Sequence, residues 1–298
     1  MTSEALSHFA ASLSPGNGMT ICVTGANRGI GFELARQAAQ FDRAKVILTA
    51  RDSIKGQSAV QGIRSSIENK DGVDLDLLFH PLDMSVSENI DNFCQWVLSE
   101  VGQVDLLINN AGVCLEGNSQ QVLHQSLATN FFGPMQLAKS LAERRPKHNA
   151  MSQAQSCSLT VINVSSGEGE LCYLSSEAQR VIKDASSLAE LQSRVRQIRN
   201  SHDGSRELAF GPTPTYSLSK AALNAATRLL GACTSQPQWE NLTKIIAVCP
   251  GDVDTDMSTA GAVLITPEEA AKDILWAAFQ GDFELNGKFC RNREIIPF

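Results

Sequence analysis

The sequence predicts an α/β fold in which one doubly wound parallel sheet carries helices on both of its faces. Short apolar runs rich in Val, Ile and Leu alternate along the chain with segments of helical spacing. Strands separated by helices form right-handed crossovers, which align the strands in parallel and cover the sheet on both sides. With 298 residues, 43% of them hydrophobic and 19% charged, the chain can bury a sizeable core.

The apolar runs place the strands of this sheet. Six runs have the length of a strand, and a seventh, at 287–290, predicts a late extra strand. The six cover residues 19–24, 45–50, 75–82, 104–109, 159–164 and 244–249. Between the first two runs, Leu34, Ala35 and Ala38 recur at helical spacing and predict the first crossover helix.

The pattern predicts a single domain after a short N-terminal tail. Residues 1–18 have no basic start, no long apolar centre and no arginine, so we expect a flexible tail and neither a secretory signal nor a transit peptide. We expect residues 19–298 to form the domain. It contains an insertion at about 167–213, in which "SSLAELQSRVRQIRN" predicts a polar helix.

Charge and composition argue against several classes of partner. The formal net charge of -7 disfavours nucleic acids and anionic membranes, which attract clustered Lys and Arg. No apolar run is long enough to span a bilayer. The eight cysteines include no C-x-x-C pair and the five histidines are dispersed, so we expect no metal site and reduced thiols in a cytoplasmic protein.

A glycine-rich turn follows the first predicted strand. It reads Thr24-Gly25-x-x-x-Gly29-x-Gly31 and leads directly into the first predicted helix. Backbone N–H groups and the positive end of the helix dipole attract anions at such a turn, and glycines let a pyrophosphate approach the backbone. Glycines alone would equally suit a structural turn, but the order of strand, turn and helix favours a dinucleotide site in a Rossmann-type fold.

A tyrosine and a lysine occupy one face of a later predicted helix. Tyr216 and Lys220 are four residues apart, which makes them neighbours on a helix surface. A free tyrosine has a pKa of about 10, and a nearby ammonium favours the phenolate and lowers that pKa. The spacing therefore predicts an acid–base pair, although Tyr-x-x-x-Lys alone is common on exposed helices.

A set of motifs from about residue 19 to residue 290 resembles, in content and in order, the motifs of the short-chain dehydrogenase/reductase family. The glycine turn matches the family pattern T-G-x-x-x-G-x-G, and "NNAG" (109–112), "TNFFG", "NVSS", "YSLSK" and "PGDVDTDM" follow it. Each motif is modest alone, but the ordered set is highly specific. The resemblance implies hydride transfer between a nicotinamide cofactor and a C=O group.

The resemblance also implies the roles of four catalytic residues. Tyr216 donates the proton, and Ser166, the second serine of "NVSS", hydrogen-bonds the carbonyl oxygen. Lys220 acts on Tyr216 and reaches the cofactor ribose, while Asn130 supports a proton relay through water. The structural alternatives are a strand-end cap for Ser166 and a helix-kinking polar residue for Asn130.

The family pattern further assigns residues around the cofactor. By resemblance, Asp83 lies beside the adenine, the "NAG" segment packs along the cofactor, and the "PGDVDT" segment borders the nicotinamide. The full predicted set is Gly25, Asn27, Arg28, Gly29, Ile30, Gly31, Arg51, Asp83, Met84, Asn110, Ala111, Gly112, Tyr216, Lys220, Pro250, Gly251, Val253 and Thr255.

Two arginines favour NADPH as the cofactor. Arg28 lies inside the glycine turn and Arg51 follows the second predicted strand, where guanidinium groups suit a ribose 2′-phosphate. Asp52 is the competing feature, because a carboxylate there disfavours a phosphate. Together the two arginines outweigh it.

The insertion resembles that of the carbonyl reductase subgroup, in which this segment covers the tyrosine-bearing helix and favours a monomer. Its members reduce aldehydes, ketones and quinones with NADPH. Glu168, Glu170 and Asp252 depart from the subgroup: they either face the pocket and disfavour acidic carbonyl compounds, or lie as solvated residues at its rim. Cys249 is either a reactive thiol or, more commonly for such a residue, buried.

Two other functions remain open at this level. One is an NADP-dependent alcohol dehydrogenase that works chiefly in the oxidative direction. The other is a non-catalytic NADPH-binding sensor or partner protein, which would be expected to lose the tyrosine, lysine or serine that this chain keeps. In the leading hypothesis the only partner is a small-molecule carbonyl substrate.

Overall fold

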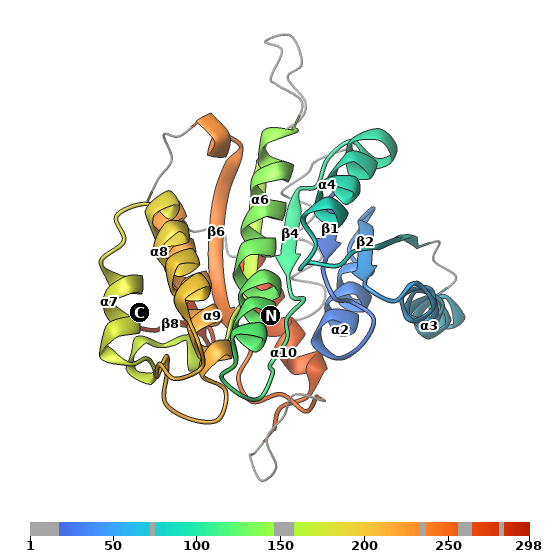
Figure 1. Cartoon of the computed structure of the whole chain (residues 1–298). Helices are drawn as coiled ribbons and strands as arrows, with labels where there is room; N and C mark the ends of the chain where they lie inside the picture. The colour runs from blue at the N-terminus through green and yellow to red at the C-terminus, as the bar shows by residue number, and fades with distance from the viewer. Residues whose placement is uncertain (1–17, 72–74, 146–157, 233–236, 256–263, 280–282) are drawn as a thin grey trace.

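The computed structural model describes residues 18–71, 75–145, 158–232, 237–255, 264–279 and 283–298. Residues 1–17 of the predicted tail lie outside this set. Within it, the chain forms one sheet between two layers of helices (Figure 1).

The strands follow the order β3-β2-β1-β4-β5-β6-β7-β8 across the sheet. All neighbouring pairs from β3 to β7 are parallel, and only the β7–β8 pair among those described is antiparallel. The strands are β1 (Thr20–Val23), β2 (Lys45–Ala50), β3 (Asp76–Pro81), β4 (Leu106–Asn109), β5 (Leu159–Val164), β6 (Leu242–Cys249), β7 (Phe289–Arg291) and β8 (Glu294–Ile295). The predicted doubly wound α/β fold is confirmed.

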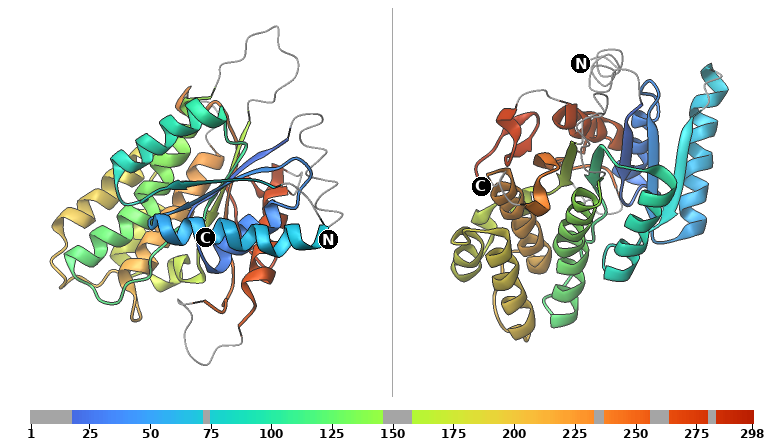
Figure 2. Two further views of the ribbon diagram at one scale, coloured as in Figure 1. Left: turned by 90° about the vertical axis from the view of Figure 1, so that its right-hand side faces the viewer. Right: turned by 90° about the horizontal axis from the view of Figure 1, so that it is seen from above.

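Helices cover both faces of the sheet (Figure 2). One face carries α2 (Gly29–Ala38), α3 (Ser53–Asp71) and α10 (Pro267–Phe279). The other carries α4 (Ser87–Trp96), α5 (Gln120–Leu127), α6 (Gly133–Glu143) and α9 (Pro214–Gly231). Two π-helical segments, η1 (Val97–Val101) and η2 (Ala128–Phe132), extend α4 and join α5 to α6.

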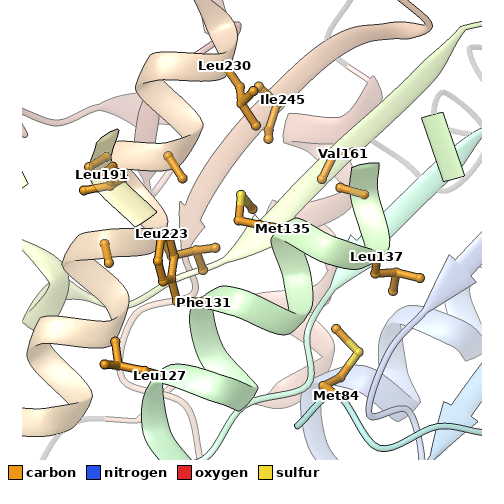
Figure 3. Packing of buried hydrophobic residues seen from close by; sticks show 14 of the residues in the cluster. Met84, Leu127, Phe131, Met135, Leu137, Val161, Leu191, Leu223, Leu230 and Ile245 are labelled. Atoms are coloured by element: carbon orange, nitrogen blue, oxygen red, sulfur yellow. The ribbon is translucent and has the colours of Figure 1, made fainter. Parts of the chain in front are cut away.

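Strand side chains alternate between the two resulting cores. In β4, Leu106 and Ile108 pack with the α2, α3 and α10 side, whereas Leu107 packs with the α4, α6 and α9 side. A strand buried on both faces explains why the sequence shows continuous apolar runs there rather than alternation. On the second side, Phe131 of η2 points toward Leu223 of α9 (Figure 3).

The insertion before Tyr216 folds against α9. It contains η3 (Gly167–Gly169), η4 (Leu171–Tyr173), α7 (Ser176–Lys183) and α8 (Leu188–Ser201), and α8 includes most of the predicted polar helix. Ser175 and Ser187 cap α7 and α8 by accepting backbone N–H groups. Ile182 and Leu191 are fully buried, so the insertion extends the core beside α9.

The C-terminal end of the described chain adds a hairpin. The predicted late strand occurs as β7, and β8 returns antiparallel to it, which the sequence analysis did not predict. Asn292 and Arg293 connect the two with φ angles of 52° and 66°. Two consecutive left-handed residues form the tight turn that suits a hairpin, but Asn-Arg lacks the glycine that usually signals it.

Candidate active site

The glycine turn is tied to the end of β4. The Thr24 hydroxyl oxygen accepts hydrogen bonds from the backbone N–H groups of Asn110 and Ala111, both at 3.0 Å. Asn110 Nδ2 donates in return to the carbonyl oxygen of Thr24 at 2.8 Å. These bonds hold the carboxyl ends of β1 and β4 together at the edge where ligands bind in doubly wound sheets.

Glycine is required at two positions of this turn. Gly25 has a φ of 65°, and a Cβ there would lie 2.8 Å from Ala111 Cα. At Gly31, a Cβ would collide with Asn110 Nδ2 and with the Gly25 carbonyl oxygen. A side chain at either position would therefore fill the space that brings the turn, β4 and α2 into contact.

The N-terminus of α2 faces this turn and has no side-chain cap. Arg28 occupies the N-cap position and forms no capping hydrogen bond with its side chain, and the first turn contains no acidic residue. The first N–H groups of a helix have no intrahelical partner and carry partial positive charge. This cradle fits the phosphates of a dinucleotide.

A cavity of about 420 Å³ opens beside the turn. Most of the predicted cofactor residues line it: Gly25, Asn27, Arg28, Gly29, Ile30, Gly31, Arg51, Met84, Asn110, Ala111, Gly112 and Thr255. The sequence analysis missed six further lining residues: Ala50, Leu82, Val113, Thr129, Asp254 and Pro267. Thr129 and Asp254 lie within the motifs "TNFFG" and "PGDVDTDM" but were not assigned to the cofactor, and the other four belong to none of the quoted motifs.

Six predicted cofactor residues lie outside the lining of this cavity, namely Asp83, Tyr216, Lys220, Pro250, Gly251 and Val253. The Asp83 carboxylate accepts hydrogen bonds from the N–H and hydroxyl of Ser85, at 2.8 and 2.6 Å. Val253 is buried and forms a bridge with Ile265. Their assignment to the cofactor remains a prediction.

The carboxylate of Asp52, which would disfavour a phosphate beside Arg28 and Arg51, already binds backbone N–H groups of α3. Asp52 Oδ1 accepts hydrogen bonds from the N–H groups of Ile54 and Lys55, at 2.9 and 3.0 Å, and so caps α3. Arg28 and Arg51 are exposed and line the cavity. The positive charges therefore face the cavity, while the nearby negative charge stabilises the start of a helix.

Lys220 lies on the same side of α9 as Tyr216. Its side chain is buried, with 4% exposed, and Nζ donates a 2.7 Å hydrogen bond to the carbonyl oxygen of Val164 at the end of β5. Nζ also lies 5.6 Å from the centroid of the Tyr216 ring. Burial lowers the pKa of Lys220 to about 8.

The pKa of Tyr216 departs from the expected direction. Part of the residue remains accessible, but burial among protein atoms raises the pKa of the phenol above its ordinary value. A hydrogen bond with Ser166 lowers that pKa without reversing the effect. The expected lowering by Lys220 does not occur, because desolvation of the phenolate outweighs it.

Ser166 lies two residues beyond the end of β5 and faces the phenol of Tyr216. Its Oγ accepts a 3.2 Å hydrogen bond from the backbone N–H of Glu168, which caps the 3-10 turn η3. Accepting this bond leaves the hydroxyl proton available for another oxygen. Ser166 therefore caps the turn that follows β5 rather than the strand itself, and this is compatible with a role toward a substrate.

Asn130 lies in the π-helical segment η2 and is completely buried. Its Oδ1 accepts from the N–H of Val113 at 2.9 Å, and its Nδ2 donates to the Val113 carbonyl and to Ser219 Oγ at 2.8 and 2.9 Å. A Cβ at Gly112 would lie 3.4 Å from Asn130 Oδ1 and 3.5 Å from Lys220 Nζ. These three residues therefore converge, with the Asn130 side chain holding the loop after β4.

Two glutamates after Ser166 differ in their partners. Glu168 Oε2 accepts hydrogen bonds from Thr213 Oγ1 and Ser217 Oγ, at 2.7 and 2.9 Å, and these contacts place it beside the start of α9. Glu170 instead pairs with Arg291 of β7 at 3.0 Å. The sequence analysis assigned no role to Thr213 or Ser217, although Ser217 lies within the "YSLSK" motif.

Among the remaining predicted features, Asp252 is exposed. Cys249 is buried, with 6% exposed, and burial raises the pKa of its thiol, which disfavours a reactive thiolate. Within the described ranges, no three His, Cys, Asp or Glu side chains gather closely enough to hold a metal ion. The helices among those residues also include none with the length and hydropathy of a membrane span.

The arrangement suits proton transfer beside a dinucleotide. A phenol, a serine hydroxyl and an ammonium lie at the carboxyl ends of the strands, next to the glycine turn. A family model described as short chain dehydrogenase matches residues 19–178, more than half of the chain. The chain belongs to the short-chain dehydrogenase family.

Several relatives share nearly the whole length of this short-chain dehydrogenase. A (+)-neomenthol dehydrogenase of Arabidopsis thaliana is 29% identical, with 93% of this chain and 97% of the relative covered. A carbonyl reductase 1 of Mus musculus, whose name specifies NADPH, is 26% identical, with the same shares covered. A solved structure of NADPH-bound carbonyl reductase from chicken fatty liver has a TM-score of 0.68 at 21% identity and covers 95% of this chain and 100% of that one.

These similarities establish the general activity. This short-chain dehydrogenase is an oxidoreductase that acts on CH–OH or C=O groups and binds a nicotinamide cofactor. The likeness to the chicken structure, at low identity, shows the fold alone.

Proposed function

We propose that this short-chain dehydrogenase is an NADPH-dependent carbonyl reductase that converts aldehydes, ketones or quinones to alcohols or hydroquinones. The observation that carries the proposal is that Ser166, Tyr216 and Lys220 lie close together just beyond the carboxyl end of β5, beside the glycine turn. The printed name of the mouse relative supports the same reaction and the same cofactor.

NADPH would supply the hydride that reduces the carbonyl carbon. The backbone of Gly25 to Gly31 and the N-terminus of α2 would hold its pyrophosphate. Arg28 and Arg51 would bind the 2′-phosphate, and the capping role of Asp52 removes the main objection to that assignment. Asp83, Pro250, Gly251 and Val253 complete the proposed cofactor set.

Tyr216 acts as the general acid in this proposal. Its raised pKa keeps the phenol protonated at neutral pH, so a proton is available when negative charge develops on the carbonyl oxygen. Ser166 Oγ, oriented by the Glu168 N–H, donates a second hydrogen bond to that oxygen.

Lys220 and Asn130 restore the proton. Lys220 is buried next to the Tyr216 ring, and its lowered pKa of about 8 lets it exchange a proton near physiological pH. Asn130 positions the loop at Gly112 beside the lysine, where a water relay would pass. A protonated phenol favours reduction over oxidation, since oxidation requires a base at this position.

We further propose a cytoplasmic monomer. In α9, most side chains are buried by the sheet, by α5 and by the insertion helices α7 and α8. Arg199 of α8 stacks over Phe132 at 5.3 Å from the ring centroid, which extends this cover to η2. A helix enclosed in this way offers little surface for association with another copy.

The proposal is tested by following NADPH oxidation with quinones, aromatic aldehydes and lipid-derived ketones, each repeated with NADH. We expect turnover with at least one carbonyl class and a higher kcat/KM with NADPH than with NADH. Absence of turnover across all classes, in protein that binds NADPH, would contradict a reductase and favour a non-catalytic binding protein.

A further inference from the structure

A carboxylate that the proposed reaction does not require lies next to the proton donor. Glu168 follows Ser166 by two residues and its N–H donates to Ser166 Oγ. Its side chain accepts hydrogen bonds from Thr213 and from Ser217, which directly follows Tyr216. Glu168 is therefore fixed from both sides of the reacting centre, by η3 and by the first turns of α9.

The charge of Glu168 acts on the groups around that centre. Burial is the main cause of the raised pKa values of Tyr216 and Cys114, and the negative charge of Glu168 raises both further. Cys114 also shares a hydrogen bond with Thr213. Glu168 and Cys114 both remain partly accessible, and both act electrostatically on Tyr216, so the two side chains lie near the phenol.

The charge of Glu168 has no cationic partner within the part of the chain that the structure describes. The ion pairs found there do not include it, whereas Glu170 pairs with Arg291. Lys220 is buried, and its Nζ donates to the Val164 carbonyl instead. Two hydroxyl groups stabilise the Glu168 carboxylate, but they do not neutralise it.

We propose that Glu168 makes the substrate site selective for carbonyl compounds that carry a positive charge, such as an ammonium group, over those that carry a carboxylate. An uncompensated charge in a partly desolvated site attracts an opposite charge and repels a like one more strongly than it would in water. The inference rests on the proposed function, because it assigns a substrate class to the same site.

The contacts at the start of α9 also suit a purely structural role, since a carboxylate stabilises a helix N-terminus. The two roles predict different results. A structural role changes stability and the turnover of all substrates alike, whereas selectivity by charge changes the ratio between charged substrates.

The test uses three benzaldehydes that differ only in the para substituent: trimethylammonium, tert-butyl and carboxylate. The kcat/KM of each is measured with saturating NADPH for wild type, Glu168→Gln and Glu170→Gln. Comparing one aldehyde across variants cancels its intrinsic reactivity. Glu170→Gln is the matched control, because it removes the same formal charge two residues away, from a carboxylate that Arg291 already neutralises.

We expect Glu168→Gln to lower the ratio of cationic to anionic aldehyde by about tenfold, which corresponds to about 1.4 kcal/mol. Any effect of Glu168→Gln on the proton donor should alter the kcat/KM of all three aldehydes alike and cancel in the ratio. In Glu170→Gln the ratio should change little. An unchanged ratio in folded, NADPH-binding Glu168→Gln would overturn the proposal, and so would an equal loss in Glu170→Gln.

A second measurement needs no substitution. In wild type, added NaCl should reduce the preference for the cationic aldehyde, because salt screens the interaction of a partly exposed charge. If Glu168→Gln does not fold, a preference that is absent or independent of salt contradicts the proposal. If wild type reduces only ketones or quinones, the same three substituents are compared on that class. Failure of wild type to oxidise NADPH with every carbonyl class would instead contradict carbonyl reduction itself, and the inference would fall with it.

Discussion

Lys220 Nζ donates a 2.7 Å hydrogen bond to the main-chain carbonyl oxygen of Val164. This bond joins α9 to the end of β5, two residues before Ser166. It fixes the ammonium next to the Tyr216 ring while leaving it without a carboxylate partner among the residues described. The result is a buried lysine whose pKa falls from 10.5 to about 8.

This lowered pKa predicts a pH-dependent effect on stability. Between about pH 8 and 10.5 the unfolded chain holds a proton on Lys220 that the folded chain has lost, so the contribution of Lys220 to stability rises with pH. We expect wild type to gain stability relative to Lys220→Met by up to about 1.36 kcal/mol per pH unit in this window. Urea unfolding of both proteins near pH 8 and near pH 9.5 measures the difference, and a constant difference would show that Lys220 is not desolvated.

The glycine turn predicts a loss of cofactor binding for Gly25→Ala. The new Cβ would meet the backbone of Ala111, in a residue with a φ of 65°. We expect a loss of stability of about 1–3 kcal/mol from backbone strain, together with loss of detectable NADPH binding.

Gly117→Ala is the control for that prediction. Gly117 also has a positive φ, of 94°, but a Cβ there meets nothing within 4 Å. Its substitution should cost comparable stability while NADPH binding, followed by fluorescence titration, is retained. Equal NADPH affinity in both variants would mean that the Gly25 turn does not hold the cofactor.

Cofactor selectivity should depend on Arg51. We expect Arg51→Gln to raise the KM for NADPH roughly tenfold or more, since a hydrogen bond to a charged group contributes about 1.5–3 kcal/mol. The KM for NADH should change little, because NADH lacks the 2′-phosphate. Steady-state kinetics with both cofactors measures this, and a parallel rise in both KM values would contradict a phosphate contact.

Substitution of Asp52, unlike that of Arg51, should affect stability rather than cofactor selectivity. Its carboxylate caps α3, so Asp52→Asn should leave NADPH selectivity nearly unchanged, and Asp52→Ala should lower stability by about 0.5–2 kcal/mol. Thermal denaturation and the ratio of kcat/KM values for NADPH and NADH provide the two readouts. A large gain in NADPH preference for Asp52→Asn would indicate that the carboxylate faces the cofactor instead.

The parts of this molecule that follow from local pattern were predictable from sequence. The order of strand and helix, the glycine turn, and the placement of Tyr216 and Lys220 on one helical face each depend on residues close together in the chain. Apolar runs such as "VDLLIN" predict buried parallel strands because both faces of β4 meet helices.

Features that depend on tertiary contacts were not predictable. The partners of Glu168 lie 45 and 49 residues away, so its position beside the phenol could not be distinguished from a solvated one. The pKa of Tyr216 was expected to fall because the spacing reveals a lysine but not the burial that outweighs it. The β7–β8 hairpin was missed because Asn292 and Arg293 adopt left-handed conformations without a glycine.

The most direct test of the account compares wild type with Tyr216→Phe in single-turnover NADPH oxidation by a carbonyl substrate that wild type reduces. The phenylalanine keeps the ring against Lys220 and removes only the hydroxyl that donates the proton. We predict a fall in rate of about 10²–10⁴, the usual contribution of a general acid, with NADPH affinity unchanged. A rate equal to that of wild type would contradict the assignment of Tyr216 and, with it, the proposed mechanism.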